Sequence, residues 1–230
     1  QNAVHAFPLT ADRESERQLL GVMNQTIVLY VCRAVRWKGI SELISWWQDL
    51  PSSYVLVVAG DGPELENWKR LAQHQGVEDR VRFLGAIQRP ILARWLAAAD
   101  CFVLPSAYEG YPHVVAESAV FNVPCLVSDQ AGNPETKQSF GDLVTVLPYL
   151  DRRAWINALT QIPTYRQTTA DRTPLATWTH MNMVEATLEI LNQAREMDYN
   201  HRQRVVMLSY EQELLNTQSA VFKRVSSLAD

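Results

Sequence analysis

Three cations follow a short apolar run near the start of the chain. Arg33, Arg36 and Lys38 come after the segment TIVLYVC at residues 26–32. A guanidinium can hold two phosphate oxygens at once, and a neighbouring lysine adds a compact positive charge. The pattern therefore predicts a loop that binds a diphosphate. The alternative is that these cations are simply solvated or cap nearby acids.

Two glutamates follow a second apolar run, Cys101–Pro105. Glu109 precedes a predicted helix over Pro112–Phe121, and Glu117 lies about one and a half turns inside it. The positions three and four residues away from Glu117 are mostly apolar, so we expect its carboxylate to face a polar ligand such as ribose or sugar hydroxyls. The alternative is a capping contact for one glutamate and a surface position for the other.

The start of this predicted helix could bind an anion. The backbone amides of His113, Val114 and Val115 would lie at its N-terminus, and Pro112 suits its first turn. A structural role for the His113 side chain is the more common alternative to a ligand role. Glu135 follows a third apolar run in the segment SDQAGNPE, where it could face the same site or belong to an ordinary turn.

The elements that must position these residues follow a regular rhythm of apolar runs and helical patterns. Apolar runs occupy 26–32, 54–59, 81–84, 101–105, 124–128 and 143–147, and helices are expected over 40–50, 64–75, 91–99, 112–121 and 152–159. The runs mostly lack alternation, which is typical of parallel strands buried on both faces. The pattern predicts an α/β fold with a doubly wound parallel sheet. Ligands bind such sheets beyond the carboxyl ends of the strands.

Composition excludes several other classes of protein. The 230 residues are 47% hydrophobic and carry a net charge of −4, which argues against disorder, fibrous repeats and general attraction to nucleic acid. Three cysteines without a CxxC spacing suggest neither a disulfide framework nor a zinc site, and fit a reducing compartment. No membrane helix or signal peptide is predicted. Past residue 160, a surface crossover over 162–174 and helices over 178–197 and 202–225 are expected.

Five segments, in this order, resemble the donor-binding half of retaining GT-B glycosyltransferases with a Glu-x7-Glu motif. They are VLYVCRAVRWKG, VVAGDGPELENWKRLA, VRFLGAI, AADCFVLPSAYEGYPHVVAES and VPCLVSDQAGNPE, within about Val28–Leu159. The segments QNAVHAFPL and ATWTHMNMVEATLEIL resemble the family's interdomain linker and its returning C-terminal helix. The resemblance implies a linker over 1–24, a Rossmann-like domain over 25–165 that is one half of a GT-B fold, and a C-terminal helical extension over 166–230.

The resemblance also implies roles for individual residues. Arg33 and Lys38 match the basic pair for the donor diphosphate, Glu109 the glutamate near the donor sugar, and Glu117 a ribose ligand. Glu135 lies in the segment that matches a Gly-x-x-Glu element, and residues 84–86 match the region against the base. The implied catalytic residues are Glu109, Arg33 and Lys38. The implied donor-binding residues are Arg33, Lys38, Leu84, Gly85, Ala86, Glu109, Gly110, Tyr111, His113, Val114, Glu117 and Glu135.

Three departures from the family pattern narrow the space near the donor. Cys32 stands where the family usually has a glycine, Ala131 replaces one glycine of a common pair, and Phe121-Asn122 replaces a small residue and a glycine. These departures leave the implied fold intact, but the identity of the substrate and the affinity for the donor depend on that space.

The resemblance implies transfer of a sugar from a nucleoside diphosphate, such as a UDP- or GDP-sugar, with retention of configuration. No metal or other cofactor is expected, and the acceptor, a sugar, lipid-linked or other molecule, would be bound by an N-terminal domain outside this chain. Without that domain we expect no turnover. We expect a cytoplasmic protein of polysaccharide or glycoconjugate biosynthesis, able to reach the membrane surface through the missing part. The alternatives are a non-catalytic nucleotide-sugar-binding or interaction module and a GT-B-like sugar-nucleotide epimerase.

Overall fold

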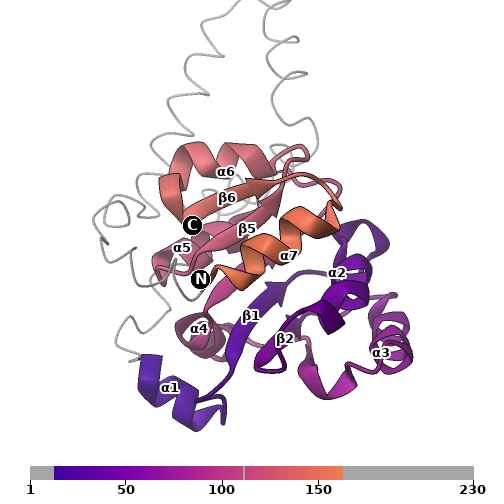
Figure 1. Cartoon of the computed structure of the whole chain (residues 1–230). Helices are drawn as coiled ribbons and strands as arrows, with labels where there is room; N and C mark the ends of the chain where they lie inside the picture. The colour runs from indigo at the N-terminus through magenta and orange to yellow at the C-terminus, as the bar shows by residue number, and fades with distance from the viewer. Residues whose placement is uncertain (1–12, 111, 163–230) are drawn as a thin grey trace, which may run out of the picture. The chain divides into compact units, whose positions relative to one another are not determined.

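The structure, a computed structural model, describes residues 13–110 and 112–162. Its strands form one six-stranded parallel sheet in the order β3-β2-β1-β4-β5-β6 (Figure 1). They span Thr26–Val31 (β1), Tyr54–Ala59 (β2), Val81–Gly85 (β3), Cys101–Leu104 (β4), Cys125–Ser128 (β5) and Val144–Leu147 (β6). The predicted doubly wound sheet is confirmed. The predicted C-terminal helical extension lies outside the described residues.

Burial explains why these apolar runs become strands. All six residues of β2 are buried, as are all four of β4 and of β5. An extended segment that is apolar on both sides is stable only between two covering layers, which the connecting helices of a parallel sheet provide. The core of the domain therefore lies on both faces of the sheet.

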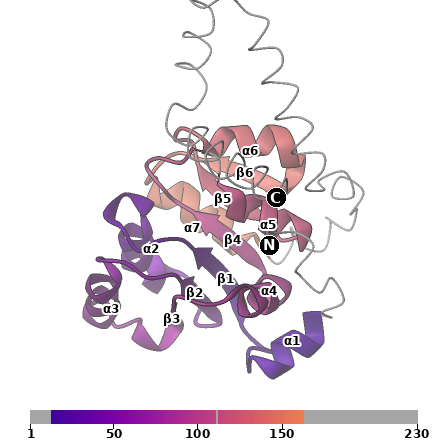
Figure 2. The ribbon, with the colours of Figure 1, turned by 180° about the vertical axis from the view of Figure 1, so that it is seen from behind.

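Seven helices are described. They span Arg13–Leu19 (α1), Ile40–Trp46 (α2), Leu65–His74 (α3), Arg89–Ala98 (α4), His113–Val120 (α5), Asn133–Phe140 (α6) and Arg152–Thr160 (α7). Helices α2, α3 and α7 cover one face of the sheet, and α4, α5 and α6 cover the other (Figures 1 and 2). From β1 the sheet is extended first toward β3 and then, on the other side, toward β6. Because each crossover is right-handed, reversing the direction moves the connecting helices to the opposite face.

Two local expectations from the sequence are corrected. Pro112 precedes α5 in extended conformation instead of lying in its first turn. The segment after β5 forms a complete helix, α6, where only a turn and the start of a helix were expected. Gly132, in left-handed conformation, and Pro134 near the first turn mark where this helix begins.

The segment before β1 contains a helix that the sequence pattern did not predict. Helix α1 packs against α4, and Arg94 of α4 donates a hydrogen bond of 2.7 Å to Glu16 of α1. The contact is largely polar, because α1 has the sequence RESERQL. The chain is thus already attached to the domain well before β1 begins.

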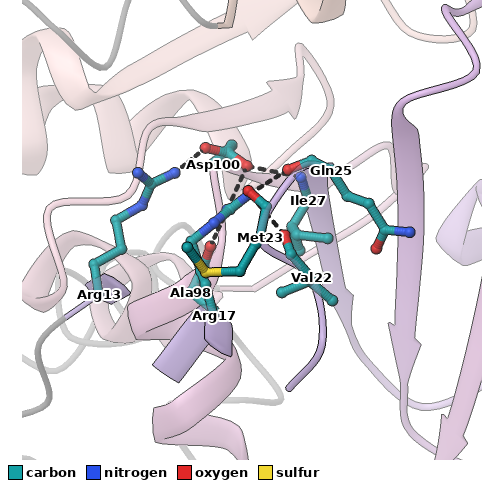
Figure 3. A network of polar contacts seen from close by, with 8 residues as sticks. All are labelled: Arg13, Arg17, Val22, Met23, Gln25, Ile27, Ala98 and Asp100. Carbon is teal, nitrogen blue, oxygen red and sulfur yellow. Dashed lines mark hydrogen bonds and ion pairs between the residues drawn. The ribbon is translucent and has the colours of Figure 1, made fainter. Parts of the chain in front are cut away.

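Arg17 anchors α1 to the sheet (Figure 3). Arg17 is 7% exposed, and its guanidinium donates hydrogen bonds to the carbonyl oxygens of Ala98 at 2.8 Å and Val22 at 3.0 Å. It also contacts Asp100 Oδ2 at 3.0 Å, and the same oxygen accepts the Ile27 amide at 2.7 Å. The buried charge therefore joins α1, the start of β1 and the turn between α4 and β4.

The strand order reverses between β1 and β4, where the ladder is short. Strand β1 pairs with β2 over its whole length, from Thr26↔Tyr54 to Val31↔Ala59. It pairs with β4 only through Val28↔Cys101 and Leu29↔Phe102. The loops that follow β1 and β4 therefore lie at the reversal of strand order, which is where doubly wound folds bind ligands.

Candidate functional site

Three loops are tied together at the carboxyl edge of the sheet. The loop after β4 is held on one side by the Ala107 amide, which donates to the Trp37 carbonyl in the loop after β1 at 2.7 Å. On the other side, the Glu109 amide donates to the Ala131 carbonyl in the loop after β5 at 2.9 Å. Segments distant in sequence thus form one surface at the point where the strand order reverses.

Two glycines permit this close approach. Gly39 and Gly132 have φ values of 72° and 85°, which side chains rarely adopt. A Cβ atom at Gly39 would lie 1.9 Å from the carbonyl oxygen of Pro105, and one at Gly132 would lie 2.1 Å from those of Glu109 and Gly110. Both positions require glycine because backbone atoms of the neighbouring loop occupy the space.

Lys38 and Glu109 form a largely buried ion pair at the centre of this surface. Lys38 Nζ lies 2.6 Å from Glu109 Oε1, and the two side chains are 13% and 10% exposed. Burial by itself lowers the pKa of Lys38, but the neighbouring Cys32 and Glu109 outweigh it and raise the pKa. The ammonium therefore stays charged at neutral pH, although it is mostly out of solvent.

Cys32 lies beside the ion pair. Burial raises the pKa of its thiol, Lys38 lowers it, and Glu109 raises it further. The net shift is upward, so the thiol is neutral at physiological pH. The residue thus places a neutral sulfur where a glycine would leave open space.

Glu117 lies on α5 and pairs with Arg89, the first residue of α4. Arg89 Nη2 is 3.4 Å from Glu117 Oε1, and the side chains are 48% and 17% exposed. Burial raises the pKa of Glu117, while Arg89 and His113 act in the opposite direction. The prediction that this carboxylate avoids bulk water holds, but its cationic partner was not foreseen.

The other predicted residues lie around this centre at different depths. Arg33, Ala86 and His113 are exposed, Gly110 is buried, and Leu84, Gly85, Val114 and Glu135 are half-buried. Residues 84–86 end β3, which is separated from β1 by β2, so they lie apart from the Lys38–Glu109 pair. Tyr111 lies outside the described residues.

Within residues 13–110 and 112–162, no group of three or more His, Cys, Asp or Glu side chains is arranged to hold a metal ion. Among the same residues, no helix has the length and apolar character that crossing a membrane requires.

Sequence comparison identifies known proteins that are similar to this chain. The model of the family described as "Glycosyl transferases group 1" matches residues 12–168. The putative teichuronic acid biosynthesis glycosyltransferase TuaC of Bacillus subtilis is 36% identical over 121 residues, which cover 52% of this chain and 29% of that protein. A GDP-mannose-dependent alpha-(1-6)-phosphatidylinositol monomannoside mannosyltransferase of Mycobacterium tuberculosis is 31% identical over 144 residues, 57% of this chain and 37% of that protein.

Structure comparison gives a concordant result for the fold. Anabaena Alr3699/HepE in complex with UDP and glucose superposes with a TM-score of 0.68 at 21% identity, over 82% of this chain and 53% of that one. A sucrose-phosphate synthase from Thermosynechococcus elongatus gives 0.67 at 26% identity, over 83% and 51%. The chain spans about a third of these curated relatives and about half of these solved chains.

Proposed function

The chain belongs to the group 1 glycosyl transferases, and we propose that it is the half of such an enzyme that binds a nucleoside-diphosphate sugar. The observation that carries the proposal is the largely buried pair of Lys38 and Glu109, 2.6 Å apart, at the reversal of strand order. The site would serve transfer of the sugar, with retention of configuration, to an acceptor held by a domain outside this chain. The UDP found with Anabaena HepE supports this class of donor.

The proposed role of Lys38 and Arg33 is to stabilise the leaving diphosphate. When the bond between the anomeric carbon and the diphosphate oxygen breaks, its electron pair stays on that oxygen. The oxygen of the acceptor hydroxyl then bonds to the anomeric carbon, and its proton passes to the departing diphosphate oxygen. A preorganised ammonium, a guanidinium and the amides at the start of α5 supply positive potential for the leaving oxygen, so we propose that no metal is required.

The two glutamates have complementary proposed roles. Glu109 holds the Lys38 ammonium in place and presents its second oxygen to the hydroxyls of the donor sugar. Glu117, at 17% side-chain exposure, has two acceptor oxygens for the two ribose hydroxyls. Arg89 stabilises the ionised form of Glu117, which accepts such hydrogen bonds better than the neutral acid.

Donor binding tests the assignment directly. A thermal-shift panel of UDP-, GDP- and ADP-sugars on the whole chain selects the donor, and calorimetry then measures its affinity for Lys38→Ala and Glu117→Ala. Each substitution removes a charged group that is proposed to contact the donor and is itself mostly out of solvent, which should cost about 2–4 kcal/mol of binding free energy, at least about a thirtyfold loss of affinity. Lys69→Ala is the matched control, because Lys69 also pairs with a glutamate but is 42% exposed on α3.

Unchanged affinity in both site variants would overturn the assignment of these residues. The absence of any shift with all three donors would overturn the proposal that this half carries the donor site. Retention is tested by the anomeric configuration of the product formed when the acceptor half is present. Conversion of the donor into another nucleotide sugar without an acceptor would instead identify an epimerase.

A further inference from the structure

We propose that Ser106, Ser128 and Asn133 are positioning residues that hold Glu109 in place for the donor sugar. The inference rests on the proposed function of the Lys38–Glu109 pair. All three side chains are fully buried, at 0% exposure, and none belongs to the residues implied by family resemblance. They come from the loop after β4, the last residue of β5 and the first residue of α6.

The three residues form one hydrogen-bonded cluster. The Ser128 hydroxyl donates to the carbonyl oxygen of Ser106 at 2.5 Å. The Asn133 amide nitrogen donates to Ser128 Oγ at 2.7 Å and contacts Ser106 Oγ at 3.4 Å. The cluster therefore joins the loop that carries Glu109 to β5 and to the start of α6.

Burial of polar side chains at this point has an energetic cost that packing alone does not explain. Within the described part of the chain the buried polar residues are Arg17, Ser106, Ser118, Ser128, Asn133 and Thr136, so half of them meet in this cluster. Small apolar residues would fill the same volume without desolvated polar atoms. A satisfied polar cluster, in contrast, fixes one relative arrangement of the groups that it joins.

The cluster acts on Glu109 through the backbone. The Glu109 amide donates to the Ala131 carbonyl at 2.9 Å, two residues before Asn133. Gly132 packs directly against the carbonyl oxygens of Glu109 and Gly110. A shift of the start of α6 would therefore move Glu109, and with it the carboxylate that contacts Lys38.

The two polar atoms of the Asn133 side chain differ in their hydrogen bonding. Its amide nitrogen is bonded within the cluster, whereas its Oδ1 atom is buried and has no hydrogen-bond partner among the described residues. The side-chain nitrogen of Asn133 thus serves the cluster as a donor, although its side-chain oxygen is left as an unpaired acceptor. Aspartate has nearly the same shape but no such donor, so Asn133→Asp should not replace it.

The test compares Ser128→Ala with Ser118→Ala in the whole chain. Ser118 is also a fully buried serine, but its hydroxyl donates to Val114 within α5 at 2.8 Å. Hydrogen exchange of the Glu109 amide should become about tenfold faster in Ser128→Ala, because the loop loses a hydrogen bond to β5. The control should leave that amide unchanged, and Ser128→Thr, which keeps the hydroxyl, should restore slow exchange.

Ligand affinity supplies the functional readout. The pair used is UDP-glucose and UDP, or GDP-mannose and GDP, whichever the wild-type chain binds. In Ser128→Ala and Asn133→Asp, affinity for the nucleoside diphosphate should stay within about twofold of the wild-type value. The ratio of the affinity for the nucleotide sugar to that for the nucleoside diphosphate should fall about tenfold. A general loss of folding would weaken both ligands equally.

The outcomes separate the two proposals. Unchanged exchange at Glu109 in Ser128→Ala would overturn the positioning role, as would equal loss of affinity for both ligands. If the wild-type chain binds neither pair, the proposed function fails, but the exchange experiment still decides whether the cluster holds Glu109. If Ser128→Ala does not fold, Asn133→Asp provides the same comparison.

Discussion

At the scale of single residues, Glu117 occupies a place where an ionised carboxylate is unfavourable for folding. Burial raises its pKa above the ordinary 4.5 despite the opposing effects of Arg89 and His113. The folded state therefore holds the proton more tightly than the unfolded chain does. The contribution of protonated Glu117 to stability is fully present below pH 4.5 and is lost as the pH rises through the raised pKa of the folded state.

Glu117→Gln should therefore stabilise the domain at pH 7 while it weakens donor binding. Glutamine imitates the neutral carboxyl at every pH, so the advantage of the variant should shrink when the pH is lowered below 4.5. Urea unfolding at pH 4 and pH 7 measures the difference. A variant that is less stable than the wild type at pH 7 would contradict the prediction. Glu66→Gln, at an exposed position on α3, is the control.

At the scale of elements, Gly132 sets the distance between the loops after β4 and β5. Gly132→Ala should destabilise the domain by about 2–4 kcal/mol, because it combines a left-handed conformation with a collision against two carbonyl oxygens. Gly76→Ala should cost only about 1 kcal/mol, since Gly76 has a similar φ of 63° with nothing near the added atom. Chemical denaturation of the two variants makes the comparison, and equal losses would contradict the role assigned to the close approach.

The strands were the most predictable elements. Their apolar runs differ from the observed bounds by one residue at most, because burial on both faces leaves a strong local signal. Helix α1 was missed because it binds the domain through Arg17 and Glu16, which hydrophobic periodicity cannot detect. Helix α6 has the polar sequence NPETKQSF and was missed for the same reason.

The candidate site was predictable in its parts but not in its pairings. Lys38, Glu109 and Glu117 were identified from their loops and from family resemblance. Their partners were not, because a sequence without an alignment carries no signal for contacts between distant segments. Arg89 reaches Glu117 from another helix, and Ser128 reaches Ser106 from a neighbouring strand.

At the scale of the whole molecule, Arg17 makes the segment before β1 part of the domain. Arg17→Ala should lower the free energy of unfolding by about 3 kcal/mol, because it removes a buried cationic partner of Asp100 and leaves the carbonyl oxygens of Ala98 and Val22 without this donor. Arg94→Ala, which removes a more exposed pair with Glu16, should cost about 0.2–1 kcal/mol. Thermal and urea unfolding measure both changes. A similar small loss in the two variants would show that Arg17 is not an anchor.

The short pairing of β1 with β4 has a mechanical consequence. The sheet consists of two three-stranded leaves, β3-β2-β1 and β4-β5-β6, joined by few main-chain bonds and, above them, by the Lys38–Glu109 contact. A ligand that contacts the loops of both leaves would connect them across this joint. Its binding free energy would add to the work needed to pull the leaves apart, so the molecule should resist stretching most strongly when the site is filled.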